Sequence, residues 1–191
     1  AYQELREKRT CFSDPDKIFS SPMKRCIQTA EILFPHQDIE ICQNLKEMDF
    51  GTFEYKNYKE LSGNPEYQAW IDSNGVRPFP AGEDIESFKH RCRTGFLACL
   101  QNVRKQQKHM HKPEMAGNIA RNTSNRNKCE NADCSVAFVV HGGTIMAVLE
   151  AFAEEKKGYY DWQVKNGCGY QAYVQMEDGA VILKDIVPVG E

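Results

Sequence analysis

Length, composition and charge exclude several classes of protein. The chain has 191 residues, enough for one α/β domain but small for two. Its 24 basic and 27 acidic residues give a net charge of -3, whereas nucleic-acid binders concentrate basic charge on one surface. No apolar run is long enough to cross a membrane, and the eight scattered cysteines suit reduced core thiols. We therefore expect one cytoplasmic domain that binds neither nucleic acid nor membranes.

Strand and helix patterns alternate along the chain. Apolar residues recur either in short β-branched runs or at helical spacing. The expected elements are strands at 17–20, 39–42 and 135–140, helices at 22–34, 58–61, 65–72, 83–107 and 144–153, and a closing hairpin of 172–176 with 181–187. Strands that alternate with helices predict a three-layer α/β fold, in which a mainly parallel sheet has helices on both faces.

Residues 108–131 break this alternation. The segment is rich in Lys, Asn and His and almost lacks aliphatic residues. It is longer than the roughly 12–15 residues usual for a loop without secondary structure. We therefore expect a flexible insertion in a single domain that spans residues 1–191. His109, His111 and Cys129 fit no closed zinc set, so we expect no metal there.

Polar residues follow two of the expected strands. The strand at 135–140 ends in His141 and two glycines, and the strand at 17–20 is followed by a serine, a proline and, one turn later, Arg25. Such a serine is typical of a helix N-cap and such a proline of the first helical position. A loop between the two strands carries Glu47. Because parallel strands end at one edge, where helix N-termini favour anions, we expect the three residues to converge in one cleft suited to phosphoryl transfer.

Four blocks of sequence resemble the histidine phosphatase superfamily. In the order of that family they are Ser20-Ser21-Pro22-x-x-Arg25, Glu47-x-Asp49-Phe50-Gly51, Pro80-Ala81-Gly82-Glu83 and Val140-His141-Gly142-Gly143-Thr144. The similarity runs to about Leu149 and looks like the phosphoglycerate mutase-like branch. It implies a phosphoglycerate mutase-like fold and a phosphohistidine intermediate, without a metal or other cofactor.

The resemblance implies roles for residues of this chain. Arg25 is expected to clamp the phosphoryl oxygens, since a guanidinium matches them bidentately. His141 is expected to donate a hydrogen bond to the phosphoryl group, with the backbone at Gly142 close to it. Glu47 is expected to protonate the leaving oxygen and then to activate the hydrolytic water. Glu83, at the start of a helix, is interpreted as structural.

The nucleophile of the family has no counterpart in this sequence. In the family, an opening apolar strand ends in Arg-His-Gly, and that histidine becomes phosphorylated. The chain contains no such triplet, and its first residues are typical of the inside of a helix. We expect an N-terminally truncated sequence, inactive as given, that lacks a central strand between those ending near Ser20 and His141. A non-catalytic relative that only binds phosphate is the alternative.

The stretch 51–80 bears on the substrate. A mutase acting on phosphoglycerate must also hold a carboxylate, and this stretch offers only Lys56, Lys59 and Arg77 as cations. We therefore expect a phosphatase acting on a small phosphorylated metabolite, with a phosphoglycerate mutase-type phosphotransferase as the alternative. Aromatic residues in and beside the stretch suit an apolar substrate, as in alpha-ribazole phosphatase-like enzymes, or simply pack a cap. The sequence does not indicate an oligomeric state.

Overall fold

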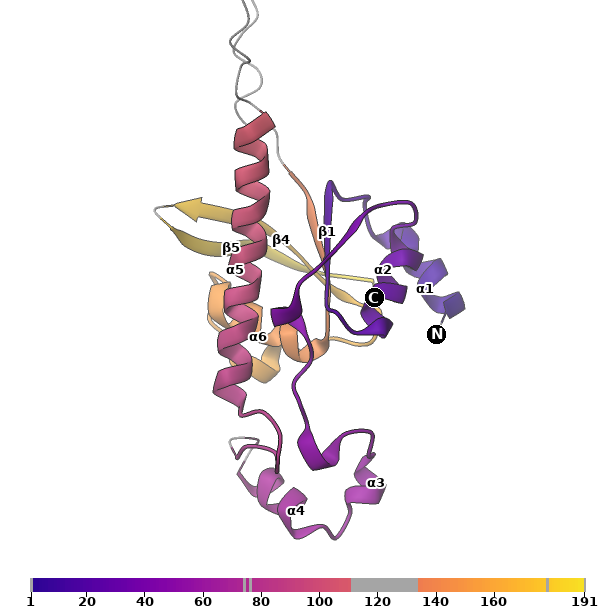
Figure 1. The fold of residues 1–191 in the computed structure, drawn as a ribbon, viewed down its shortest axis with the longest axis vertical. Coiled ribbons are helices and arrows are strands. Elements are labelled where there is room, and N and C mark those ends of the chain that lie inside the picture. The colour runs from indigo at the N-terminus through magenta and orange to yellow at the C-terminus, as the bar shows by residue number, and fades with distance from the viewer. Residues whose placement is uncertain (1, 74, 76, 111–133, 178, 191) are drawn as a thin grey trace, which may run out of the picture.

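Strands alternate with helices along the chain, as Figure 1 shows. The computed structural model describes residues 2–73, 75, 77–110, 134–177 and 179–190. In chain order its elements are α1 (Tyr2–Lys8), η1 (Arg9–Cys11), β1 (Lys17–Ser20), α2 (Lys24–Leu33), β2 (Ile39–Ile41), η2 (Gln43–Leu45), η3 (Gly51–Phe53), α3 (Tyr58–Leu61), α4 (Pro65–Asp72), α5 (Ile85–Met110), β3 (Val136–Val139), α6 (Gly142–Phe152), η4 (Tyr159–Trp162), β4 (Gly169–Glu177) and β5 (Ala180–Val189).

A parallel sheet of order β2-β1-β3 has helices on both faces. Neighbouring residues of a strand point to opposite faces, so Ile18 and Phe19 of β1 belong to different layers. Ile18 packs with Ala30 and other apolar residues of α2. Phe19 packs with Cys99 and Val103 of α5 on the other side. The expected three-layer α/β architecture is therefore confirmed.

β1 and β3 pair directly with one another. Their parallel register runs from Lys17 opposite Val136 to Ser20 opposite Val139, and the Ser21 amide continues it by donating to the Val139 carbonyl at 3.1 Å. The absence of the central strand that the family resemblance implies between β1 and β3 predicts that their facing edges are unpaired, and for the described structure that prediction is wrong. Direct pairing satisfies backbone groups that would otherwise be buried without partners. It also brings Ser21 beside the residues that follow β3.

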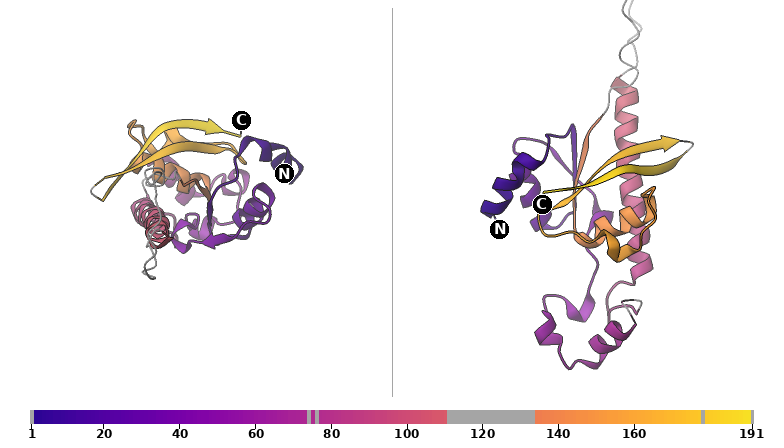
Figure 2. Two further views of the ribbon diagram at one scale, coloured as in Figure 1. Left: turned by 90° about the horizontal axis from the view of Figure 1, so that it is seen from above. Right: turned by 180° about the vertical axis from the view of Figure 1, so that it is seen from behind.

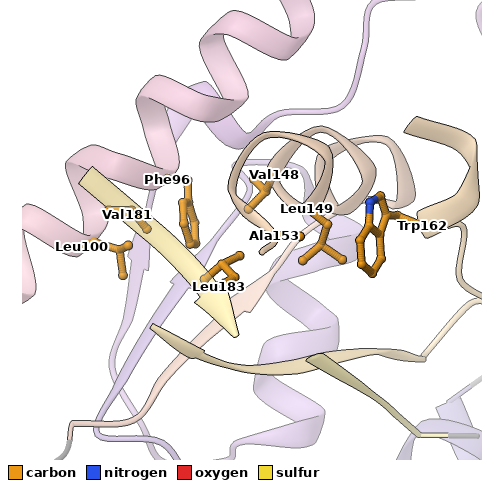
Figure 3. Close-up of a cluster of buried hydrophobic side chains, with 8 residues drawn as sticks. All are labelled: Phe96, Leu100, Val148, Leu149, Ala153, Trp162, Val181 and Leu183. Atoms are coloured by element: carbon orange, nitrogen blue, oxygen red, sulfur yellow. The ribbon is translucent and has the colours of Figure 1, made fainter. Parts of the chain in front are cut away.

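The C-terminal hairpin does not extend the parallel sheet. β4 and β5 form a separate antiparallel pair, and an isolated bridge from Ala153 to Leu183 links β5 to the end of α6. Figures 1 and 2 show the hairpin lying over the α6 side of the molecule. A hydrophobic cluster joins it to α5, α6 and η4 and is drawn in Figure 3: Phe96, Leu100, Val148, Leu149, Ala153, Trp162, Val181 and Leu183.

The ends of three expected helices differ from the structure, and α6 begins two residues before its predicted start, at Gly142. α2 begins at Lys24, its N-cap is Met23, and no side chain caps it, so the predicted start at Pro22 with a serine N-cap is wrong. The Ser21 hydroxyl oxygen accepts from the Met23 amide at 3.3 Å, just before the helix, and it also contacts His141 Nε2 at 2.7 Å. α5 continues to Met110, into the expected insertion. The rest of that insertion, residues 111–131, lies outside the described residues.

A lobe formed by α3 and α4 lies beyond the N-terminal end of α5 (Figures 1 and 2). Both helices have the predicted bounds and are capped by asparagines, Asn57 and Asn64, whose side chains accept hydrogen bonds from the first-turn amides. Behind them Phe53 and Phe79 are buried with Met48 of the Glu47 loop. We call residues 50–80 the cap. Its core is thus continuous with the segment that carries Glu47.

Candidate active site

The three predicted residues lie together at the carboxyl ends of β1 and β3. Arg25 comes from the first turn of α2, His141 is the N-cap of α6, and Glu47 follows η2. The Arg25 Nε donates to His141 Nδ1 at 3.2 Å. The Glu47 carboxylate oxygen Oε2 lies 3.8 Å from the same ring nitrogen. The structure therefore brings together the residues that the strand ends predicted.

His141 is buried and uses both ring nitrogens within the protein. Its Nε2 lies 2.7 Å from Ser21 Oγ. Because Nδ1 accepts from Arg25, the ring proton is assigned to Nε2, which donates to Ser21. Burial, and then the positive charges of Arg25 and Arg91, lower the pKa of His141 to about 4. In this state the imidazole is neutral, and it reaches a phosphoryl group only by exchanging its bond to Ser21.

Two groups beside His141 are suited to an anion. Arg25 is exposed, and within the described part of the chain its side chain makes its hydrogen bond through Nε, which leaves the two terminal nitrogens for a ligand. α6 begins at Gly142, where a Cβ would have no atom within 4 Å, so the backbone there is open to a close approach. A guanidinium and a helix N-terminus both favour a phosphoryl group.

Glu47 is held between His141 and α6. Its side chain is only 16 % exposed, and Oε1 accepts from the Met48 amide at 2.9 Å. A Cβ on Gly143 would lie 2.7 Å from Oε1, so the carboxyl rests against the glycine backbone. Burial raises the pKa of Glu47 above its ordinary value, although the Met48 amide and Arg25 oppose this effect. A carboxyl that keeps its proton to higher pH is suited to act as an acid.

Arg91 of α5 fixes the loop that carries Glu47, and sequence reasoning missed it. Its Nε and Nη2 donate to the two oxygens of Glu83, both at 2.7 Å. Nη1 donates to the carbonyls of Asn44 and Lys46 at 3.1 and 2.6 Å, and Nη2 donates to that of Glu47 at 2.9 Å. The sequence gives no local signal for these contacts, since Arg91 and its partners are 8 to 47 positions apart in the chain.

Two of the four family-like blocks meet backbone to backbone. The Glu83 amide donates to the Asp49 carbonyl at 2.9 Å, and the Thr52 amide donates to the Pro80 carbonyl at 3.0 Å. Gly51 has a φ of 54°, and a Cβ there would overlap the Pro80 carbonyl oxygen. Only glycine permits so close a crossing. The crossing places Glu83 and the cap beside Glu47.

The described residues offer neither a cluster of metal ligands nor a membrane-spanning helix. Among the residues that the structure describes, no set of three or more His, Cys, Asp or Glu side chains is arranged to hold a metal ion. Across the same residues, no helix is both long and apolar enough to span a bilayer. His111 and Cys129, which the sequence analysis weighed as metal ligands, lie outside the described residues.

The low pKa of His141 predicts that stability falls in mild acid. The unfolded chain binds a proton near pH 6.5 but the folded chain only near pH 4, so the free energy of unfolding should decrease as the pH falls between these values. The loss is about 3 kcal/mol at most. Urea denaturation at several pH values measures it.

The control for this prediction is His141→Gln, which does not titrate and should show a shallower slope. Glu47 acts in the opposite direction, because a carboxyl with a raised pKa favours folding at lower pH. Equal slopes for the parent and His141→Gln would contradict the prediction.

An arginine, a helix N-terminus and a shielded carboxyl lie together at one edge of an α/β sheet. This arrangement is typical of proteins that bind phosphate groups. The chain belongs to the histidine phosphatase superfamily, branch 1, whose family model matches residues 3–111. This confirms the family that the four blocks indicated. No curated protein sequence matches the chain significantly.

Solved structures of low sequence identity share the fold. An alpha-ribazole phosphatase from Shigella flexneri has a TM-score of 0.63 at 15% identity, with 96% of this chain and 79% of that one covered. A phosphoserine phosphatase from Entamoeba histolytica, in complex with 3-phosphoglyceric acid, has a TM-score of 0.64 at 20% identity, with 97% and 80% covered. A phosphoglycerate mutase from Thermus thermophilus has a TM-score of 0.52 at 18% identity, with 98% and 80% covered. The phosphoglycerate mutase-like fold is thereby established.

Proposed function

We propose that the protein is a cytoplasmic, metal-independent phosphomonoester hydrolase that acts through a phosphohistidine intermediate on a small phosphorylated metabolite. The observation that carries this proposal is the convergence of Arg25, the open N-terminus of α6 at Gly142 and the shielded carboxyl of Glu47. Two of these groups attract the phosphoryl oxygens, and the third is suited to hold the proton that an alkoxide leaving group needs.

The proposed reaction has two steps. A histidine nitrogen attacks phosphorus while the bond to the leaving oxygen breaks, and that oxygen takes the proton of Glu47. Water then attacks phosphorus, the nitrogen–phosphorus bond breaks, and Glu47 takes a proton from the water. Arg25 and the amide of Gly142 bind the oxygens whose charge is redistributed in both steps.

His141 has a subsidiary role in this proposal. It accepts the Nε hydrogen of Arg25 and so orients the guanidinium. Donation from its Nε2 to the phosphoryl group, which the family resemblance implies, requires that the bond to Ser21 be exchanged for one to the ligand. Because both nitrogens are occupied, His141 is not our candidate for the nucleophile. The reaction therefore needs a histidine that the described residues do not place at the site.

A non-catalytic phosphate-binding relative is the second candidate function. The observation that favours it is the state of His141, which in the described structure is neutral, buried and bonded at both nitrogens. A protein of this kind retains the anion site of Arg25 and α6 but has no use for the proton of Glu47. A phosphoglycerate mutase-type phosphotransferase remains the closest alternative within the enzyme class.

Comparison of the 191-residue chain with an extended version, in which a strand ending in the family's Arg-His-Gly precedes residue 1, tests the proposal. We expect no turnover of p-nitrophenyl phosphate by the chain and steady turnover by the extended version. Rapid quenching of the extended version should trap an acid-labile phosphoryl group on a histidine, located by mass spectrometry. The chain alone should bind vanadate, and Arg25→Ala should weaken that binding, because Arg25 supplies the free guanidinium nitrogens.

Each alternative has its own result in this experiment. A phosphoryl group on His141 would show that the nucleophile is assigned wrongly. Vanadate binding without turnover by either protein would favour the non-catalytic relative. Transfer of phosphate within phosphoglycerate, faster than its release to water, would favour the mutase.

A further inference from the structure

An apolar pocket opens beside Glu47, between the cap and η4. Its volume is about 180 Å³, and its lining includes Glu47 and Gly143 but neither Arg25 nor His141. Glu47 therefore stands at the boundary between the proposed phosphate site and this pocket. In the proposed reaction the leaving oxygen is protonated by Glu47 at this boundary, and the pocket is the space beside it for the rest of the leaving group.

Aromatic rings form two walls of the pocket. On the cap side Trp70 stacks on Phe79, with ring centroids 5.0 Å apart, and Phe50 meets Phe79 edge-on at 5.1 Å. On the other side Tyr159 and Tyr160 of η4 meet edge-on at 5.0 Å. Trp70 also stacks on Tyr67 at 6.0 Å, and Lys89 Nζ lies 4.6 Å over the Tyr159 ring. The rings are thus fixed by their neighbours, and the parts of them that line the pocket offer apolar surface to a planar ring.

The two walls are held at fixed positions. Tyr159 donates its hydroxyl to the Gly143 carbonyl at 3.2 Å, which ties the η4 wall to α6. A Cβ on Gly75 would lie 2.6 Å from the Tyr160 hydroxyl and 3.5 Å from the Trp70 ring, so the two walls meet at this glycine. Packing therefore ties the η4 wall to α6 and brings the two walls together at Gly75.

Charge in the pocket argues against an acidic leaving group. Its lining contains two carboxylates, and that of Glu83 is already paired with Arg91. Among the described residues of the lining, Arg77 is the only lysine or arginine, and it is exposed. A leaving group with several anionic groups would be repelled by Glu47 and would find a single solvated cation. An uncharged aromatic leaving group would contact the aromatic side chains of the lining.

We infer that the substrate is a phosphomonoester of an alcohol that carries a planar, uncharged aromatic ring, which sits between Trp70 and Tyr160 with its oxygen at Glu47. This inference rests on the proposed function for the position of the phosphate. The ring pocket itself belongs to the free protein, so its occupancy is measurable without catalysis.

Binding of 4-nitrobenzyl alcohol to the 191-residue chain tests the pocket. A nitroaromatic ring quenches tryptophan fluorescence on contact, and the chain has two tryptophans. Trp70 lines the pocket, whereas Trp162 is 2% exposed within the cluster of Figure 3. We expect saturable quenching that persists in Trp162→Phe, so that the signal is assigned to Trp70.

Matched tyrosine variants make the test specific. Tyr160→Ala removes one wall and should weaken binding of the alcohol by about fivefold to tenfold, the effect of one lost aromatic contact. Tyr58→Ala is the control, because Tyr58 is 69% exposed against 57% for Tyr160 and does not line the pocket. Equal affinity in the two variants, or no saturable quenching in the parent chain, would overturn the pocket assignment.

Turnover by the extended version tests the substrate class. 2-Phenylethyl phosphate and 2-cyclohexylethyl phosphate have similar leaving groups and similar size, and we expect at least a fivefold higher kcat/KM for the phenyl ester. Equal values would overturn the aromatic assignment. If the alcohol binds as expected but neither ester is hydrolysed, the proposed function fails while the pocket assignment stands.

Discussion

In the version of the chain extended by a strand ending in Arg-His-Gly, Glu47→Gln is expected to lower kcat/KM for alkyl phosphates by about 10²–10⁴-fold, the usual contribution of a general acid. An alkoxide cannot leave without a proton, and Glu47 is shielded and has a raised pKa. Nitrophenolate leaves readily without protonation, so p-nitrophenyl phosphate should lose far less. Steady-state rates with 2-phenylethyl phosphate and p-nitrophenyl phosphate measure the contrast.

The pH profile gives an independent readout of the same role. A general acid must be protonated, so kcat/KM for the alkyl ester should fall as the pH rises through the pKa of Glu47. Burial moves that fall to a higher pH than for an exposed glutamate. Glu47→Gln should abolish the fall in rate at high pH. If Glu47 were only structural, the variant would keep that fall.

Glu83→Gln is the matched control, because Glu83 also lines the pocket but is paired with Arg91. Loss of that pair should slow both substrates to a similar degree, since it loosens the loop and not the proton donor. Equal losses on both substrates for Glu47→Gln would instead show that Glu47 positions the substrate or holds structure. A selective loss for Glu83→Gln would move the acid to Glu83.

Local patterns in the sequence were sufficient for the elements and for much of the candidate site. The bounds of β1, α3 and α4 were predicted to the residue, because short apolar runs and helix caps act over a few positions. The meeting of Arg25 and His141 was predictable because parallel strands end at one edge of a sheet. Such rules place residues by topology and do not depend on side-chain detail.

Other features depend on contacts that no local pattern carries. Ser21 has the sequence context of a helix cap, yet its hydroxyl bonds to a histidine 120 residues away. The direct pairing of β1 with β3 depends on which other strands could pair with the same edge of β1, and that is a property of the whole fold. The hairpin was predicted, but its packing on α6 arises from apolar residues such as Leu183 that fit a surface formed by distant helices.

Arg91→Met is expected to lower the free energy of unfolding by about 3 kcal/mol, the lower end of the range for breaking a buried ion pair. The side chains of Arg91 and Glu83 are 22% and 18% exposed, so some solvent reaches the charge that is left. The variant also leaves the carbonyls of Asn44, Lys46 and Glu47 without their donor. Urea denaturation of the 191-residue chain measures the change.

Arg91→Lys separates the charge of Arg91 from its geometry. A lysine keeps the positive charge beside Glu83, but a single ammonium cannot reproduce a fork that reaches the two Glu83 oxygens and the carbonyls of residues 44, 46 and 47 together. We expect a stability between those of the parent and Arg91→Met. Arg104→Lys, at an exposed position of the same helix, is the control and should change stability by less than about 0.5 kcal/mol. If Arg91→Lys matched that control, charge alone would account for the contact. If Arg91→Lys lost stability, and if in the extended version it selectively lost alkyl phosphate hydrolysis, the fork would be shown to position the Glu47 loop.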